Sequence, residues 1–417
     1  MTLNSPVENF QMEDHMPNLA HKSFNTRAVH AGERVPSSDY IPVATPIHPT
    51  VGFVYDSMDE VDAIFAATRE GYVYPRYGSP TVTAFETAIA NLEQGQAAHA
   101  FSTGMAAIHA ALLAAGVRAN TTVVAAIDVY GATYTLLNRL FKELGVAASW
   151  VDVSDLRTVE KALQETYAVA LYVETISNPL LKVADVSTLA QHAHKYGAQF
   201  LVDNTFASPW LCNPLTLGAD YVIHSATKYI GGHGDVMAGV VVTSVERRKT
   251  LYELNKLVGG TLGPFEAWLA LRGVKTLPLR MRQQSTNAAH IAAWLSQHPK
   301  IVHVNYPGLS THPQHALAKN LFGDKGFGGM LSFEIANADR RTAFRFMESL
   351  ELCLAATTLG DIYSLVLHPA SSSHRGLTPE EREKVGIKEG LVRLSAGIED
   401  ADDIIADLEQ ALAHISS

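Results

Sequence analysis

The residues best suited to chemistry stand directly after the predicted strands of this chain. Apolar segments at 97–101, 121–127, 168–173, 199–202 and 221–224 predict these strands. In an open α/β sheet, ligands bind beyond the carboxyl ends of the strands, so side chains in these places are expected to meet. The residues that follow the strands are Gly104, Met105, Tyr130, Asn178, Asp203 and the run Ser225-Ala226-Thr227-Lys228.

Lys228 and Asp203 together indicate a particular kind of cofactor. A lysine amine can condense with an aldehyde to form an imine. A carboxylate at the end of a buried strand can keep a pyridine nitrogen protonated, so that the ring accepts electrons. The glycine-rich segment YIGGHGD at 229–235 lets the backbone approach a ligand closely. These features match the requirements of pyridoxal phosphate (PLP), which is a pyridine aldehyde that carries a phosphate.

A phosphate site is predicted at Ser102-Thr103-Gly104-Met105, a turn that precedes a long alanine-rich helix. The free N–H groups of a first helical turn bind anions, and the hydroxyls of Ser225 and Thr227 can add donors. Tyr130 is suited to cover the face of the ring. Each residue alone also fits an ordinary role, as a surface lysine, a helix N-cap, a turn aspartate or a core tyrosine. Their joint occurrence at strand ends favours the cofactor site.

The elements that must position these residues alternate as strand and helix from about residue 96, which predicts a largely parallel sheet covered on both faces. After about residue 273, strand-like segments at 330–334 and 391–394 lie among helices. The first 70 residues look irregular, with four prolines between positions 36 and 49. We therefore expect an N-terminal arm that contacts a neighbouring subunit (1–70), a large PLP-binding α/β domain (71–272) and a C-terminal α+β domain (273–417).

The composition narrows the class of protein. A chain of 417 residues exceeds one ordinary core, and 47% hydrophobic with 18% charged residues is typical of a globular protein. No apolar run reaches the ~18 residues that a membrane helix needs, and the polar N-terminus does not resemble a secretion signal. The two cysteines, Cys212 and Cys353, are far apart in the sequence and show no metal-ligand spacing. This usage favours a reducing compartment, the cytoplasm. The net charge of −10 argues against nucleic acid, and the 18 histidines form no HExxH-type cluster, so no metal is predicted.

Seven stretches of the chain resemble the trans-sulfuration (Cys/Met metabolism) family of PLP enzymes, over nearly all of residues 24–414. The run SATKY at 225–229, preceded by DNT at 203–205, is highly specific for this family. Its members include cystathionine γ-synthase, cystathionine γ-lyase, cystathionine β-lyase, methionine γ-lyase and O-acylhomoserine sulfhydrylase. The matching stretches are YPRYGSPT (74–81), FSTGMAAI (101–108), VYGATY (129–134), SNPLLKVAD (177–185), LVDNTFASP (201–209), HSATKYIGGHGD (224–235) and VRLSAGIED (392–400).

The resemblance implies the type I fold of PLP-dependent enzymes, like that of aspartate aminotransferase. This fold has a mostly parallel seven-stranded sheet and a smaller C-terminal α+β domain. Lys228 is implied to hold PLP as a Schiff base and to carry protons between substrate carbons. Asp203 is implied to pair with the pyridine nitrogen, and Tyr130 to stack on the ring and assist catalysis. The residues implied to hold the phosphate are Gly104, Met105, Ser225 and Thr227.

The resemblance also implies active sites that are shared between subunits of a homotetramer, built as a dimer of dimers. Tyr74 and Arg76 are implied to reach the phosphate of a neighbouring subunit, and Asn178 to lie near the ring oxygen. Arg393 is implied to bind the substrate carboxylate with both ends of its guanidinium group. Without the resemblance, both arginines also fit ordinary salt bridges. The expected substrate-binding residues are Arg393, Thr358 and Tyr363.

The leading functional prediction is γ-elimination on a γ-substituted amino acid such as methionine, homocysteine or another homoserine derivative, through a vinylglycine-type intermediate. One alternative is γ-replacement, as in O-acylhomoserine sulfhydrylase or cystathionine γ-synthase. Another is a γ-lyase for a non-protein amino acid with an oxygen-linked γ-substituent. A non-catalytic, regulatory PLP-binding protein is a further alternative, but the presence of both Lys228 and Asp203 argues against it, because passive binding needs no protonated electron sink.

Substrate choice is expected to depend on the segment 357–376. Its LGD and HPAS pieces resemble methionine γ-lyase and O-acylhomoserine sulfhydrylase. Tyr363 stands where the cystathionine enzymes and methionine γ-lyase usually have glutamate, and Ala132 stands where methionine γ-lyase typically has cysteine. A tyrosine is no anionic partner for the distal ammonium of cystathionine, so Tyr363 either faces a different γ-substituent or packs in the protein. His374 and Arg375 could line the entrance of the site, but as isolated polar residues in a loop they are expected to be exposed to solvent.

Overall fold

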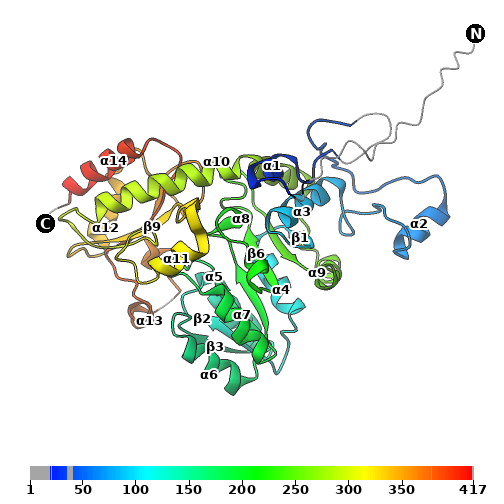
Figure 1. The fold of residues 1–417 in the computed structure, drawn as a ribbon, viewed down its shortest axis with the longest axis horizontal. Coiled ribbons are helices and arrows are strands. Elements are labelled where there is room, and N and C mark those ends of the chain that lie inside the picture. The colour runs from blue at the N-terminus through cyan, green and yellow to red at the C-terminus, as the bar shows by residue number, and fades with distance from the viewer. Residues whose placement is uncertain (1–18, 20, 35–40, 377, 416–417) are drawn as a thin grey trace, which may run out of the picture.

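A computed structural model of the chain describes residues 19, 21–34, 41–376 and 378–415. Figure 1 shows a large sheet with helices on its faces, and a second group of strands and helices formed by the C-terminal part of the chain. The long helix α10 (Pro264–Leu295) runs past both groups and so connects them. The predicted boundary between residues 272 and 273 falls inside this helix.

The large sheet has seven strands in the spatial order β1-β7-β6-β5-β4-β2-β3. In the described residues, β7 pairs antiparallel with both β1 and β6, and the other neighbours in this sheet pair in parallel. Six of the seven strands therefore end at the same edge, which confirms the predicted mostly parallel sheet. The strands are β1 (Ala97–Phe101), β2 (Thr122–Ala126), β3 (Ala147–Val151), β4 (Ala170–Glu174), β5 (Gln199–Asp203), β6 (Tyr221–Ser225) and β7 (Gly239–Thr243).

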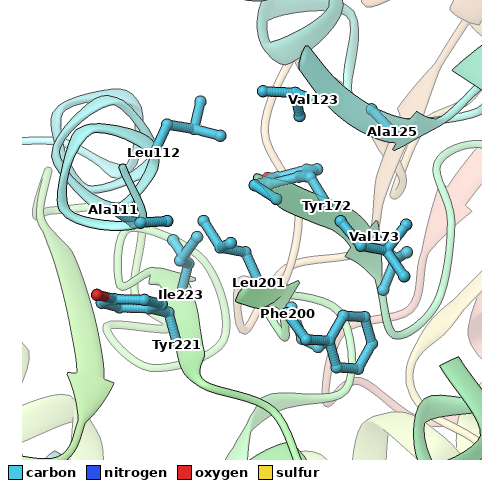
Figure 2. Close-up of a cluster of buried hydrophobic side chains, with 14 of the residues drawn as sticks. Ala111, Leu112, Val123, Ala125, Tyr172, Val173, Phe200, Leu201, Tyr221 and Ile223 are labelled. Atoms are coloured by element: carbon cyan, nitrogen blue, oxygen red, sulfur yellow. The ribbon is translucent and has the colours of Figure 1, made fainter. Parts of the chain in front are cut away.

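The central strands are covered on both faces, which explains their continuous apolar sequences. All five residues of β4 and of β7 are buried, as expected for strands between two helical layers. Figure 2 shows side chains from β2, β4, β5 and β6 packed together with Ala111 and Leu112 of α4 (Gly104–Ala114). The other helices of this domain are α3 (Pro80–Leu92), α5 (Gly131–Thr135), α6 (Leu156–Thr166), α7 (Val186–Lys195), α8 (Ser208–Leu211) and α9 (Val245–Val258), with a π-helical segment η2 (Leu136–Phe141) and a 3-10 turn η3 (Pro214–Leu217).

The C-terminal part forms a five-stranded sheet in the order β10-β11-β12-β9-β8, which confirms the predicted smaller α+β unit. The buried side of its last helix carries Ile404, Leu408 and Leu412, the apolar stripe that the sequence predicts. No helix among the described residues has the length and apolar character needed to cross a membrane. The strands are β8 (Ile301–Asn305), β9 (Met330–Ile335), β10 (Leu354–Ala355), β11 (Leu365–Leu367) and β12 (Leu391–Ser395), and the helices are α11 (His315–Phe322), α12 (Arg340–Glu348), α13 (Pro379–Lys384) and α14 (Ala401–Ala413), with 3-10 turns η4 (Gly323–Lys325) and η5 (Pro369–Ser371).

Two expectations about secondary structure are corrected. The N-terminal arm contains helices α1 (Phe24–His30) and α2 (Met58–Phe65), although its prolines indicate irregular chain. Helix α1 is stabilised by packing on α3 and α10, and the Ser57 hydroxyl caps the start of α2. Neither feature is a repeat of apolar residues, so the periodicity of the sequence does not predict these two helices. Strand β3 was not predicted, because it is an edge strand whose sequence AASWV is only partly buried. Residues 1–18, 20 and 35–40 of the predicted arm lie outside the described residues.

Arg280 of α10 holds the segment that follows Lys228. Its Nη1 donates to the carbonyl oxygen of Tyr229 at 2.6 Å, and its Nη2 donates to the carbonyl oxygens of Gly273 at 2.8 Å and Ile230 at 3.3 Å. Burial lowers the pKa of Arg280 to about 10, so the guanidinium remains charged at neutral pH. A buried charge is tolerated there because three carbonyl dipoles solvate it.

Replacing Arg280 with lysine is expected to lower the free energy of unfolding by about 2 kcal/mol, because a compact ammonium cannot span the carbonyls that the guanidinium reaches. Urea unfolding followed by circular dichroism measures the change. Arg282→Lys, at an exposed arginine of the same helix, is the control and should change stability by less than about 0.5 kcal/mol. Wild-type stability of Arg280→Lys would contradict this account.

Candidate active site

A cavity of about 460 Å³ lies at the carboxyl edge of the large sheet. Its wall combines residues that follow β4, β5 and β6, the start of α4, and Arg393 of β12, so both domains contribute. The structure thus brings together side chains that are up to 290 residues apart (from Thr103 to Arg393). The sequence-predicted residues in this wall are Gly104, Met105, Tyr130, Asn178, Asp203, Ser225, Thr227, Lys228 and Arg393.

The Lys228 amine lies in the cavity wall. Its Nζ donates to Oγ1 of Thr358 at 3.0 Å. Burial, with a smaller effect from the positive charge of Arg393, lowers the pKa of Lys228 to about 8. A lysine with such a pKa is neutral in a useful fraction of molecules near neutral pH, and only the neutral amine attacks an aldehyde. This environment fits a lysine that forms an imine.

Asp203 is held through both carboxylate oxygens. Oδ1 accepts the backbone N–H of Thr205 at 3.0 Å, and Oδ2 accepts the hydroxyl of Tyr172 at 3.1 Å. Burial raises the pKa of Asp203, and the hydrogen bonds from Thr205 act in the opposite direction. A protonated ring nitrogen would supply the missing positive charge, so the carboxylate fits the partner of a pyridinium.

The start of α4 forms a narrow cradle. The Thr103 side chain caps the helix by accepting the N–H of Ala106 at 2.9 Å. A Cβ atom on Gly104 would lie 2.8 Å from Cβ of Ser225, so only glycine permits this close approach. The first-turn N–H groups of a helix have no intrahelical acceptors and attract anions. With the Ser225 hydroxyl beside them, they fit a phosphate group, whereas the Thr227 hydroxyl is already bonded to the backbone of Ala238.

Arg393 is buried and only partly satisfied. Nη1 donates to Oδ1 of Asn178 at 3.1 Å and Nη2 donates to the carbonyl oxygen of Thr358 at 3.1 Å. Its Nε has no hydrogen-bond partner among the described residues. Burial lowers the pKa of Arg393 to about 10, which leaves it charged at neutral pH. A guanidinium with unused donors in a cavity fits the carboxylate of an amino acid.

Several wall residues were not among the predicted set, and Glu174 is the most informative. Its Oε1 accepts the backbone N–H of Tyr130 at 2.6 Å, and burial raises its pKa well above the ordinary value. Glu174 ends strand β4 just as Asp203 ends β5, so the strand-end rule that selected Asp203 applies equally to it. Other wall residues that were not singled out lie in segments that the sequence did mark: Thr205 belongs to the DNT run at 203–205, and Thr357, Ser372 and Ser373 belong to the segment 357–376.

Four predicted residues, Tyr74, Arg76, Thr358 and Tyr363, lie outside the cavity wall of the single chain. Arg76 donates from Nη1 to the carbonyl oxygen of Lys256 at 2.7 Å, and its guanidinium lies 5.1 Å from the ring centre of Tyr74. Tyr363 is 50% exposed. Thr358 is also absent from the wall, but it contacts Lys228 and Arg393 directly. The roles of Tyr74, Arg76 and Tyr363 therefore stay predictions.

The expectation that His374 is exposed is wrong. Only 3% of this residue is accessible, because it lies against a small cavity that is also lined by Asp128 and Asn178. Burial lowers the pKa of His374 to about 4, so its imidazole is neutral at physiological pH. Its neighbour Arg375 is exposed as expected. A loop histidine can be buried when the loop itself folds back over another element, which sequence periodicity does not reveal.

The amine, the buried carboxylate, the glycine cradle and the partly satisfied arginine together fit PLP and an amino acid, which defines the class of PLP-dependent enzymes. The sequence matches the family described as Cys/Met metabolism PLP-dependent enzyme over residues 25–413. The chain belongs to this family. PLP is therefore its cofactor, and its chemistry is PLP-dependent elimination or replacement on a small amino-acid substrate.

Relatives with assigned activities cover nearly the whole chain. An L-methionine gamma-lyase of Fusobacterium nucleatum subsp. polymorphum is 43% identical over 393 residues, which cover 94% of this chain and 98% of the relative. A cystathionine gamma-lyase of Bacillus subtilis (strain 168) is 45% identical over 351 residues, which cover 84% and 91%. The solved structure of a Campylobacter jejuni protein described as an O-acetylhomoserine (thiol)-lyase has a TM-score of 0.89 at 31% identity, covers 94% and 100% of the two chains, and carries N'-pyridoxyl-lysine-5'-monophosphate.

The rate at which the apo-protein takes up PLP is expected to rise with pH and to level off above about 8, because the neutral fraction of Lys228 follows its lowered pKa. Replacing Arg393 with methionine removes a positive charge that lowers this pKa, so the inflection should move to higher pH. Stopped-flow absorbance of the bound cofactor measures the rate. Arg375→Met, at an exposed arginine, is the control. An inflection near the ~10.4 of a free lysine in the wild type would contradict the assignment.

Proposed function

We propose that the chain is a γ-lyase, which removes the γ-substituent of an amino acid and releases 2-oxobutanoate and ammonia. The observation that carries the proposal is the position of Thr358. Its hydroxyl accepts from the Lys228 amine and its carbonyl oxygen accepts from Arg393, so one residue fixes the base relative to the carboxylate-binding group. This link keeps the α-carbon of a bound amino acid within range of the lysine.

In the proposed reaction, bound PLP supplies an electron sink that stabilises negative charge on the α-carbon. Arg393 orients the substrate through its carboxylate. Lys228, once free of the cofactor, would remove the α-proton and then a proton from the β-carbon, for which its lowered pKa suits it. The γ-group would leave with the electron pair of its bond and take up a proton. Protons would then return to the β- and γ-carbons, and water would release 2-oxobutanoate and ammonia. Asp203 holds the proton on the ring nitrogen. The Tyr130 side chain is 41% exposed at the cavity mouth, where it can cover the ring and assist departure of the γ-group.

We propose elimination rather than replacement because relatives named as γ-lyases are 43% and 45% identical to the chain. The second candidate is γ-replacement, in which a thiol adds after the γ-group leaves. It is supported by the structural likeness to the O-acetylhomoserine (thiol)-lyase. Both reactions share every residue assigned above, so they differ only in the fate of the substrate after the γ-group has left.

A substrate panel separates the two reactions. The purified enzyme is incubated with methionine, homocysteine, cystathionine, O-acetylhomoserine and an amino acid with another oxygen-linked γ-group, with and without an added thiol. The expected result is 2-oxobutanoate without thiol, detected by lactate dehydrogenase coupling, and none from Lys228→Ala. A thioether that forms only with thiol would establish replacement instead, and no reaction with any γ-substituted amino acid would refute both.

Tyr363 is proposed to face the γ-substituent in the assembled enzyme. Replacing it with glutamate is expected to shift the preference toward cystathionine, raising its kcat/KM relative to methionine by about tenfold, because a hydrogen bond to a charged group contributes about 1.5–3 kcal/mol. Tyr167→Glu, at a tyrosine that is 86% exposed, is the matched control. An unchanged ranking in Tyr363→Glu would show that Tyr363 only packs in the protein.

The proposal includes an assembly with shared sites, a homotetramer built from dimers. This part of the proposal is supported by the positions of Tyr74 and Arg76 outside the cavity of their own chain and by the partial exposure of Tyr74. They are proposed to contact the phosphate bound by a neighbouring subunit, where a guanidinium and a phenol are suitable donors.

A further inference from the structure

Tyr172 contacts Asp203 from beneath the cavity. It lies on β4, it is fully buried, and it does not belong to the cavity wall. Its hydroxyl donates to Oδ2 of Asp203 at 3.1 Å. Figure 2 shows Tyr172 on β4 beside apolar side chains of the sheet. The carboxylate that accepts its hydroxyl belongs to the adjacent strand β5. Thr133 and Glu174 are further polar neighbours of this tyrosine, and its hydroxyl donates to a residue of the cavity wall.

The charge of Asp203 depends on groups with opposite effects. Burial raises the pKa of Asp203. Glu174 lies opposite Asp203 in the β4–β5 register, and the two carboxyl groups interact. The hydrogen bonds from Thr205, the positive charge that His224 of β6 can carry and the hydroxyl of Tyr172 favour the anion. Burial and the neighbouring carboxylates raise the pKa of Tyr172 well above 10, so it remains a donor at any working pH.

We propose that Tyr172 is a positioning residue that fixes the Asp203 carboxylate and keeps it anionic, as the partner of the PLP ring nitrogen. The inference rests on the proposed role of Asp203 at that nitrogen. Oδ1 is held by the N–H of Thr205 and Oδ2 by Tyr172, so the carboxylate cannot rotate without losing a hydrogen bond. Its remaining lone pairs are then available to the ring N–H.

The test compares Tyr172→Phe with Tyr221→Phe, each of which loses one buried hydroxyl. Tyr221 of β6 is the matched control, because its hydroxyl donates to the carbonyl oxygen of Ala114 at the same 3.1 Å, away from the cavity. Apo-protein of each variant is titrated with PLP and with an analogue in which carbon replaces the ring nitrogen. The readout is the dissociation constant of each, measured from absorbance and from quenching of protein fluorescence.

Tyr172→Phe is expected to weaken PLP binding about tenfold and to leave binding of the analogue within about twofold, because the lost hydrogen bond acts on the charge facing the nitrogen. Tyr221→Phe should bind both like the wild type. The pH dependence is a second readout. Without the phenol, the pKa of the Asp203 carboxyl is higher. As the pH is lowered, PLP binding by Tyr172→Phe should therefore begin to weaken at a higher pH than PLP binding by the wild type.

Two results would overturn the inference: unchanged PLP binding by Tyr172→Phe, or equal weakening of PLP and the analogue, which indicates a structural role alone. If the wild type itself does not distinguish PLP from the analogue, the proposed role of Asp203 fails instead, and with it the basis of the inference. If Tyr172→Phe does not fold, 3-fluorotyrosine at position 172 replaces it. This residue keeps the hydroxyl as a stronger donor, so PLP should bind more tightly and the analogue should not; unchanged PLP binding would again overturn the proposal.

Discussion

The site depends on the burial of ionisable groups at the edge of the large sheet. A charge that is removed from water must find a partner or become neutral. Burial raises the pKa of the Asp203 carboxyl and lowers the pKa of the Lys228 amine to about 8. In the proposed site, the ring nitrogen of PLP would offset the unfavourable burial of the Asp203 carboxylate, and the neutral Lys228 amine would attack the aldehyde.

The second requirement is that two domains keep a constant relative position. Lys228 follows a strand of the large sheet, while Thr358 and Arg393 belong to the C-terminal part of the chain. An apolar cluster that includes Tyr229, Leu277 and Leu359 fills the space between these parts. Arg280 of α10 attaches the segment after Lys228 to the helix that runs along both domains. The hydrogen bond from Lys228 to Thr358 is therefore supported by packing on both sides.

The strand-end rule identified eight residues of the cavity wall, Lys228 and Asp203 among them, because it follows from topology. Parallel strands joined by right-handed crossovers end at one edge, so residues after different strands become neighbours. The rule applies to Glu174 as well, because this residue ends β4. The chemistry of PLP does not require a second carboxylate, however, and only the structure shows that Glu174 accepts the backbone N–H of Tyr130. Tyr172 was beyond the reach of the rule, because a tyrosine inside a buried strand is normally a packing residue, and only its distance to Asp203 distinguishes it. His374 was misjudged, because its burial results from the path of a loop.

The sequence alone determined the class of fold and the cofactor, and it predicted the residues that face this cofactor, since apolar runs, strand-end polar residues and the SATKY segment are local features that survive in any conformation of the chain. It also established the alternatives of elimination and replacement. The tertiary structure decided which groups share a proton, a hydrogen bond or a buried environment. These properties depend on distances between residues far apart in the chain, such as Tyr172 and Asp203 or Lys228 and Thr358. Electrostatic effects vary steeply with such distances and with burial, and neither quantity exists until the chain has folded.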